Sequence, residues 1–157
     1  MRGRWMSKQR SWLKSFVGHR LEMYLSPAWA EARVGPLRAM LERLEIEHLR
    51  HGGYNNGELF VSYGQFVDHG ISRKSIKRTQ QLAVDLGFLE VTYTEGDGVI
   101  RPPNAYRLTY VPAKGKTTPT DEWKAITKEK ARQLVEAFRA ADKAAAKATK
   151  KTIREAA

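Results

Sequence analysis

The segment GISRKSIKRTQQLAVDLGFLEV places four cationic side chains within six residues, and its first acidic residue is Asp85. Arginine and lysine neutralise phosphates and can bind the edge of guanine, while glutamine matches the edge of adenine. Residue types in this pattern therefore indicate a surface that binds a nucleic acid. The four cations are Arg73, Lys74, Lys77 and Arg78.

The periodicity of this segment predicts how its side chains divide between core and solvent. At 100° per residue, five residues form a core face, the opposite face holds the four cations with Gln80 and Gln81, and Gly87 ends the helix. An outward cationic face is often only a solvated surface. Here the scarcity of acidic residues leaves few ion pairs within the helix, which favours a polyanionic partner. The core face consists of Ile76, Thr79, Leu82, Ala83 and Leu86.

The residues before this helix predict the arrangement that would present it to DNA. Ser62 and Gln65 have capping-box spacing, so a short helix begins there and ends at Gly70, for which we expect a positive φ. Ser72 is expected to cap the following helix. A short helix, a tight turn and a second helix form the helix-turn-helix layout, in which the first residues of the second helix approach base edges.

Further elements are predicted on both sides of this unit. Ser26 as N-cap and Pro27 at the first helical position begin a short helix, and a longer helix starts at Pro36 and stops at Gly52 and Gly53. The segment ELFVS is expected to be a short strand. After the cationic helix, the apolar period changes to two in FLEVTYTE and NAYRLTYV, and the turn-rich GDGVIRPP between them completes a β-hairpin.

In this order the elements resemble a winged helix-turn-helix domain. The resemblance is carried by LFVSYGQFVDHGISRKSIKRTQQLAVDLGFLEVTY and NAYRLTY, and DLGFLEV is similar to the passage from a recognition helix into the first wing strand. The chain also resembles small bacterial winged-helix proteins and some plasmid-encoded replication initiators. The resemblance implies an α+β fold, with a three-helix core, a short strand and a β-hairpin wing. The expected DNA-binding residues are Arg73, Lys74, Ser75, Lys77, Arg78 and Gln81, with Arg101 in the wing loop.

Charge is unevenly distributed along the 157 residues, whose net charge is +11 and whose pI is about 10.0. The N-terminal twenty residues contain six cations and no acidic residue, and the C-terminal segment is also basic. Both ends are typical of arms that bind nucleic acid without sequence preference. We expect a basic aromatic arm at 1–25, the winged helix-turn-helix domain at 26–111, a linker at 112–119, and a C-terminal helix with an Ala/Lys-rich basic tail at 120–157.

The two ends leave alternatives open. Thr120 is expected to cap a helix whose apolar stripe, from Trp123 to Phe138, packs on the domain or on a second subunit. Beyond Ala140 the chain is either a solvated helix or a disordered arm. Aromatic residues of the N-terminal arm could stack on bases, lie at a membrane surface or pack against the domain. These are Trp5, Trp12 and Phe16.

The sequence carries no convincing enzyme signal. It has no cysteine, which excludes disulfides and thiolate metal sites. The motif GKTT at Gly115 has Tyr110 where a phosphate-binding loop needs a glycine, and His48 and His51 have no third metal ligand nearby. We therefore predict neither catalysis, nor a cofactor, nor a metal. No apolar run reaches the length of a membrane span, so we expect a bacterial cytoplasmic, nucleoid-associated protein.

These observations favour a sequence-specific double-stranded DNA-binding protein, of the kind that regulates transcription in bacteria, plasmids or phages. A replication initiator or a nucleoid-associated protein is the alternative within the same class. From another class, the domain could be a protein-interaction module that docks on RNA polymerase, and RNA binding is a weaker option. One helix-turn-helix reads only a few base pairs, which favours a homodimer on a repeated half-site, although no dimerisation motif is visible.

Overall fold

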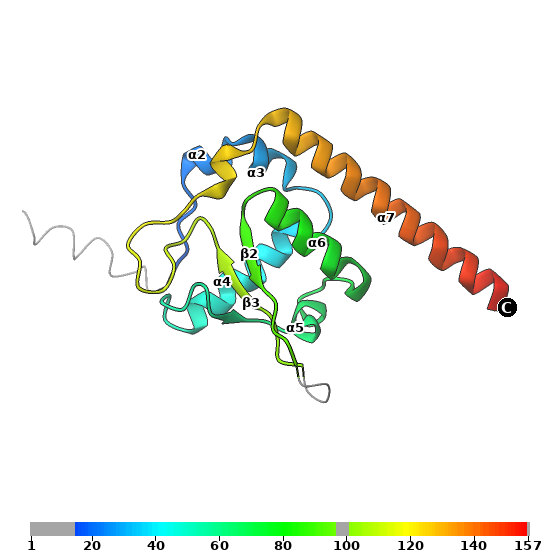
Figure 1. Ribbon diagram of the computed structural model, residues 1–157, viewed down its shortest axis with the longest axis horizontal. Coiled ribbons are helices and arrows are strands. Elements are labelled where there is room, and N and C mark those ends of the chain that lie inside the picture. Colours follow the sequence, from blue (N-terminus) through cyan, green and yellow to red (C-terminus); the bar gives the residue numbers. More distant parts are fainter. Residues whose placement is uncertain (1–14, 97–100, 157) are drawn as a thin grey trace, which may run out of the picture.

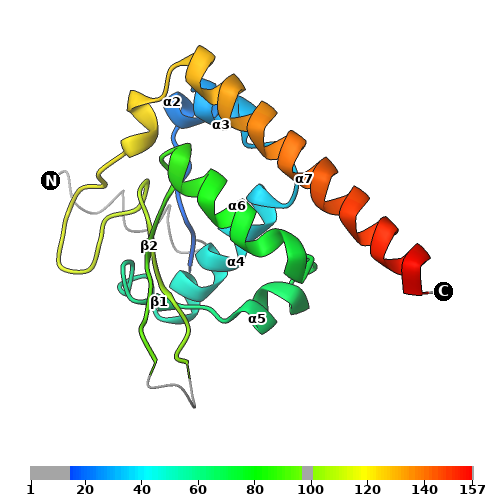
Figure 2. The ribbon, with the colours of Figure 1, turned by 45° about the vertical axis from the view of Figure 1, so that its right-hand side comes forward.

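An α+β fold with a three-stranded antiparallel sheet forms the part of the chain that this computed structural model describes, residues 15–96 and 101–156 (Figures 1 and 2). The α+β class agrees with the prediction. Helix α6 is central, since it contacts α4, α5, α7 and β2. The helices are α2 (Leu21–Tyr24), α3 (Pro27–Glu31), α4 (Leu37–Arg50), α5 (Tyr63–Asp68), α6 (Arg73–Asp85), the 3₁₀ helix η1 (Glu122–Ala125) and α7 (Lys128–Ala156). The strands are β1 (Leu59–Phe60), β2 (Leu89–Thr92) and β3 (Ala105–Leu108).

The first predicted helices begin and end where local signals place them. The Ser26 side chain accepts a hydrogen bond from the backbone N–H of Trp29 at 3.1 Å, and Pro27 is the first residue of α3. Helix α4 is followed by Gly52 and Gly53, whose φ values are +74° and +77°. Capping and termination are therefore confirmed here, because both depend on interactions within a few residues.

The predicted succession of a short helix, a turn and a longer helix is also confirmed. The Ser62 hydroxyl accepts from the Gln65 N–H at 3.2 Å, and the Gln65 side chain accepts from the Ser62 N–H at 2.8 Å. Gly70 follows α5 with a φ of +89°. Ser72 occupies the N-cap position of α6, but its side chain makes no capping bond. The Ser75 N–H donates instead to the Ser72 carbonyl oxygen at 2.9 Å, so the expected acceptor is replaced by backbone.

Strand β3 lies in the middle of the sheet, in the order β1-β3-β2, and is antiparallel to both neighbours. Strand β1 is shorter than predicted: Leu59 lies opposite Tyr106, and the pairing ends one residue later. Before β1 begins, the buried side chain of Asn56 makes the hydrogen bonds to β3 that a longer strand would make. Its Oδ1 accepts from the Leu108 N–H at 2.7 Å and its Nδ2 donates to the Leu108 carbonyl at 2.8 Å. A side chain thus completes the ladder on this edge of β3.

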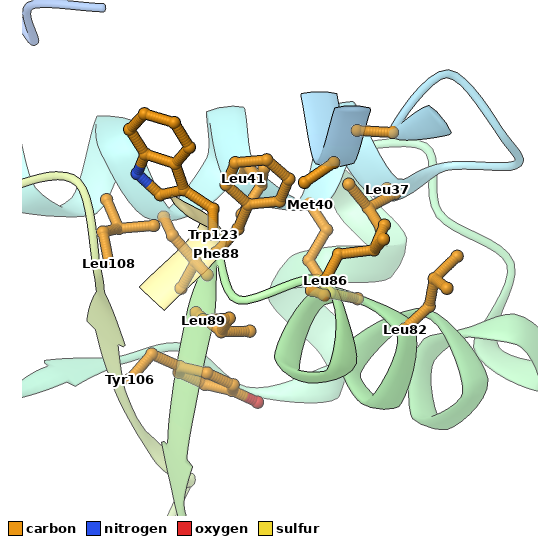
Figure 3. Packing of buried hydrophobic residues seen from close by; sticks show 14 of the residues in the cluster. Leu37, Met40, Leu41, Leu82, Leu86, Phe88, Leu89, Tyr106, Leu108 and Trp123 are labelled. Atoms are coloured by element: carbon orange, nitrogen blue, oxygen red, sulfur yellow. The ribbon is translucent and has the colours of Figure 1, made fainter. Parts of the chain in front are cut away.

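One hydrophobic core joins the central elements to the segments on both sides. Met23 of α2 and Trp123 of η1 belong to the same buried cluster as the residues of α4 and α6. Figure 3 shows Leu41 of α4, Leu86 at the end of α6 and Trp123 among these core residues. The core therefore extends past both ends of the 26–111 segment. Helix α7 packs on the domain itself through Ala131, Val135 and Phe138.

The C-terminal helix begins later than predicted. Thr120 does not cap it: its side-chain oxygen accepts from Arg107 Nη1 at 2.5 Å, and its hydroxyl donates to the Glu122 carboxylate at 2.6 Å. Asp121 adopts a left-handed φ of +54° before η1. Helix α7 begins after Thr127, whose side-chain oxygen accepts from the Lys130 N–H at 3.2 Å. It continues to the end of the described chain (Figure 1). Of the two alternatives for the Ala/Lys-rich tail, the structure has the solvated helix.

Part of the described N-terminal segment also packs against the domain, whereas Phe16 is exposed. The His19 ring lies edge-on to Tyr110, with ring centroids 5.5 Å apart, and its Nε2 is 2.7 Å from a carboxylate oxygen of Glu45. The aromatic residues Trp5 and Trp12, for which the sequence left stacking or packing open, lie outside the described residues. Among residues 15–96 and 101–156, no helix combines the length and apolarity that crossing a bilayer requires.

Candidate nucleic-acid interface

Helix α6 has the predicted division into a buried and a cationic face. Arg73, Lys74 and Lys77 are exposed, whereas the Arg78 side chain is only 28% exposed. The helix has no acidic residue in its first turn. Its cations are thus presented on a rigid element whose inner side is fixed by the core. The buried inner face consists of Ile76, Thr79, Leu82, Ala83 and Leu86.

The two glutamines of α6 differ, and the prediction for Gln80 is wrong. Gln81 is exposed and donates to the Asp85 carboxylate at 3.0 Å, but the Gln80 side chain is fully buried. The Tyr63 hydroxyl donates to Gln80 Oε1 at 3.1 Å, and Gln80 Nε2 donates to the Tyr106 hydroxyl. The helical wheel could not show this, because the partners of Gln80, Tyr63 of α5 and Tyr106 of β3, lie far from it in the sequence.

A groove of about 710 Å³ lies between the first two turns of α6 and the β2–β3 hairpin, and we call it the hairpin groove. Arg73 and Lys77 reach it from α6, and Arg101 reaches it from the hairpin side. Its described lining contains three cations and no acidic residue. The full lining is Val61, Ser62, Tyr63, Arg73, Lys77, Tyr93, Arg101, Pro102, Pro103 and Asn104.

Neutral hydroxyl groups line the hairpin groove and support it from behind. Burial raises the pKa of the Tyr63 hydroxyl, with a further rise from Tyr93, whereas the cations Arg101 and Arg73 act in the opposite direction. Burial also raises the pKa of Tyr106, which holds Gln80 behind the groove. Both hydroxyls therefore stay protonated at neutral pH. The positive charge of the groove is not reduced by a phenolate.

The other two cations of α6 face helix α7. Arg78 Nη2 donates to a carboxylate oxygen of Asp142 at 2.8 Å, and Lys74 Nζ lies 3.5 Å from the Thr149 hydroxyl. A second groove of about 440 Å³ separates the two helices, and we call it the α7 groove. Lys74, Ser75, Arg78, Asp142, Ala145 and Thr149 contribute to its walls.

The structure therefore separates the seven predicted DNA-binding residues into three places. The hairpin groove contains Arg73, Lys77 and Arg101. The α7 groove contains Lys74, Ser75 and Arg78, and Gln81 lies apart from both, near β2. Sequence reasoning missed the tyrosines of the hairpin groove. Tyr63 is the first residue of α5 and Tyr93 comes directly after β2, so only their position beside the cations gives them a role in the site.

Comparisons with protein-family models, with curated proteins and with solved structures find no match to this chain. Its function must be inferred from the site itself. His48 is buried, and burial lowers its pKa, so this residue is a neutral core histidine at neutral pH. In the described ranges, no three histidine, aspartate or glutamate side chains come together as they would around a metal ion.

Proposed function

We propose that the protein is a winged helix-turn-helix protein that binds double-stranded DNA, with α6 as the recognition helix and the β2–β3 hairpin as the wing. The order of the elements supports this proposal, since α5, a turn at Gly70, α6 and an antiparallel hairpin follow one another directly. In this docking mode the second helix lies in the major groove and its N-terminal residues face the bases.

The observation that carries the proposal is the convergence of Arg73, Lys77 and Arg101 on the hairpin groove. None of the three forms a salt bridge with a described residue. Cations that only solubilise a surface need not gather in a concave site, and cations with a structural role are commonly paired with carboxylates. A groove that concentrates positive charge attracts a polyanion, because the potentials of its cations add.

Within this arrangement, different roles are proposed for the helix and for the hairpin. Arg73 and Lys77 lie one helical turn apart at the start of α6, so we propose that they contact base edges. An arginine or lysine that binds guanine in this way contributes about 1–3 kcal/mol of discrimination against the wrong base. Arg101 is proposed to contact the sugar-phosphate backbone and to fix the orientation of the domain. The biological role that we propose is transcriptional regulation in a bacterium, a plasmid or a phage.

In-vitro selection from random duplexes tests the proposal. The wild type should select a short motif, and Arg73→Ala or Lys77→Ala should relax that motif at one position and weaken binding to it by about 1–3 kcal/mol. Lys116→Ala is the matched control, since Lys116 is an exposed cation of the 112–119 segment and lines neither groove. This control should retain the motif.

Selection of no motif by the wild type would overturn sequence-specific reading by α6. A motif that survives both helix substitutions would do the same. In either case the leading hypothesis would be that the domain is a protein-interaction module, for example one that docks on RNA polymerase. Its basic segments would then only add affinity for nucleic acid. Pull-down with purified RNA polymerase would then be the next measurement.

A further inference from the structure

One stripe of helix α7 faces the domain, and its character changes along its length. Six positions spaced alternately by four and three residues make up this stripe, as expected for one side of a helix that packs against a neighbour. The first three are apolar and buried, whereas the last three include a carboxylate and a hydroxyl and are partly or fully exposed. The six are Ala131, Val135, Phe138, Asp142, Ala145 and Thr149.

The C-terminal half of α7 is therefore held against α6 mainly by polar contacts. Beyond Phe138, no described residue of α7 is buried. Figure 2 shows α7 continuing past α6 toward the C-terminus. Two side-chain hydrogen bonds to α6 are made here, between Asp142 and Arg78 and between Thr149 and Lys74. Exposed contacts of this kind are weak, so this half of the helix can be displaced more easily than the half anchored in the core.

Asp142 has a special place in this segment. It is the sole acidic residue between Glu136 and Glu155, a stretch with six cations, and it is directed to Arg78. The Asp142 side chain is 54% exposed. Arg78 Nε, in contrast, is buried and has no hydrogen-bond partner among the described residues. The guanidinium thus has donor capacity that its contact with Asp142 does not use.

A carboxylate oxygen on an arginine occupies a position that a phosphate oxygen can also occupy, because both are anionic acceptors of the same donor groups. We propose that Arg78 and Lys74 form a phosphate-binding site of α6 that Asp142 occupies when DNA is absent. The C-terminal half of α7 then competes with the DNA backbone for this side of the helix. This inference rests on the proposed function, and it adds a site and an intramolecular competitor to it.

Measurement of duplex affinity for Asp142→Asn tests this competition. The variant keeps the size of the side chain and removes its charge, so binding to a duplex that the wild type selects should become about two- to fivefold tighter, as expected for loss of an exposed ion pair. Glu136→Gln is the matched control. It makes the same change of charge on an exposed residue of the same helix that lines neither groove.

A double-mutant cycle with Arg78→Ala shows whether the gain passes through Arg78. The gain from Asp142→Asn should disappear in the Arg78→Ala background. An equal gain in Glu136→Gln, or a gain that persists without Arg78, would overturn the inference and leave only a general effect of net charge. DNA binding that is equally tight in Asp142→Asn and wild type would overturn this inference alone. Absence of duplex binding by the wild type would overturn the proposed function together with it.

Discussion

The two sides of helix α6 carry the same residue types in different surroundings. On the hairpin side, Arg73 and Lys77 face an open groove that contains a third cation and no described acidic residue. On the α7 side, Arg78 is paired with Asp142, and Lys74 lies beside the same helix. Lys74 directly follows Arg73 in the sequence, and Arg78 directly follows Lys77. One step along a helix turns the side chain by 100°, which is enough to move it from one groove to the other.

This comparison shows that the number of cations on a helix face does not say how many of them a ligand can reach. A helical wheel places all four on one outward surface, and only the tertiary neighbours decide which are accessible. The hairpin side depends on β3 and on the buried Gln80, whereas the α7 side depends on how η1 and α7 are held. Substitutions that act on one side alone can therefore separate the two.

The largest effect is expected at Gly87, which joins α6 to β2 and contacts η1. Its φ is +80°, and a Cβ atom there would lie 2.5 Å from the backbone nitrogen of Trp123. Gly87→Ala should lower the free energy of unfolding by about 2–4 kcal/mol, because the cost of a left-handed backbone adds to overpacking against η1. Chemical denaturation measures the loss. Hydrogen exchange of α7 should show that the α7 side loosens first.

Gly70→Ala is the control for this prediction. Gly70 also has a positive φ, +89°, but a Cβ atom there would meet nothing within 4 Å. Only the conformational cost of about 1–2 kcal/mol is then expected. Equal losses in the two variants would mean that the contact between Gly87 and Trp123 does not anchor η1, and the α7 side would need another explanation.

The two adjacent glutamines give an intermediate effect that is specific to the hairpin side. Gln80→Leu removes both hydrogen bonds of a buried side chain and leaves the Tyr63 and Tyr106 hydroxyls without this partner. The free energy of unfolding should fall by about 1–3 kcal/mol. Gln81→Leu changes an exposed neighbour and should stay within about 0.5 kcal/mol of the wild type. Thermal or chemical denaturation measures the loss of stability in both variants. Two equally small losses of the free energy of unfolding would contradict the burial of Gln80.

What could be predicted from the sequence was encoded within a few residues. Capping at Ser26 and Ser62, the turn at Gly70 and the buried face of α6 all depend on local hydrogen bonds or on helical period, which are visible in the chain. The α+β class followed from the change of apolar period after α6. That the cations of α6 bind DNA stays a prediction.

What could not be predicted depends on residues far apart in the sequence. The burial of Gln80 requires Tyr106, and the pairing of Arg78 requires Asp142, which no period or cap brings into view. The same holds for Asn56, whose side chain completes the edge of β3. The error at Thr120 also involves a distant residue: its side-chain oxygen accepts from Arg107 Nη1 rather than from a backbone N–H at a helix N-terminus, and its hydroxyl donates to the Glu122 carboxylate.

The smallest effect is expected on the outer surface of α7, which faces neither groove. Lys150 and Lys151 are exposed, and a cation that meets only phosphate carries no sequence information. Lys150→Ala or Lys151→Ala should therefore weaken binding equally on all duplexes and reduce the slope of log affinity against log salt by about one, with the selected motif unchanged. Arg73→Ala is the contrasting variant, since it should change the motif. Titration of selected and scrambled duplexes at several salt concentrations measures both quantities. A motif altered by either lysine substitution would place α7 on the bases, and the hairpin side of α6 would then not be the sole reading surface.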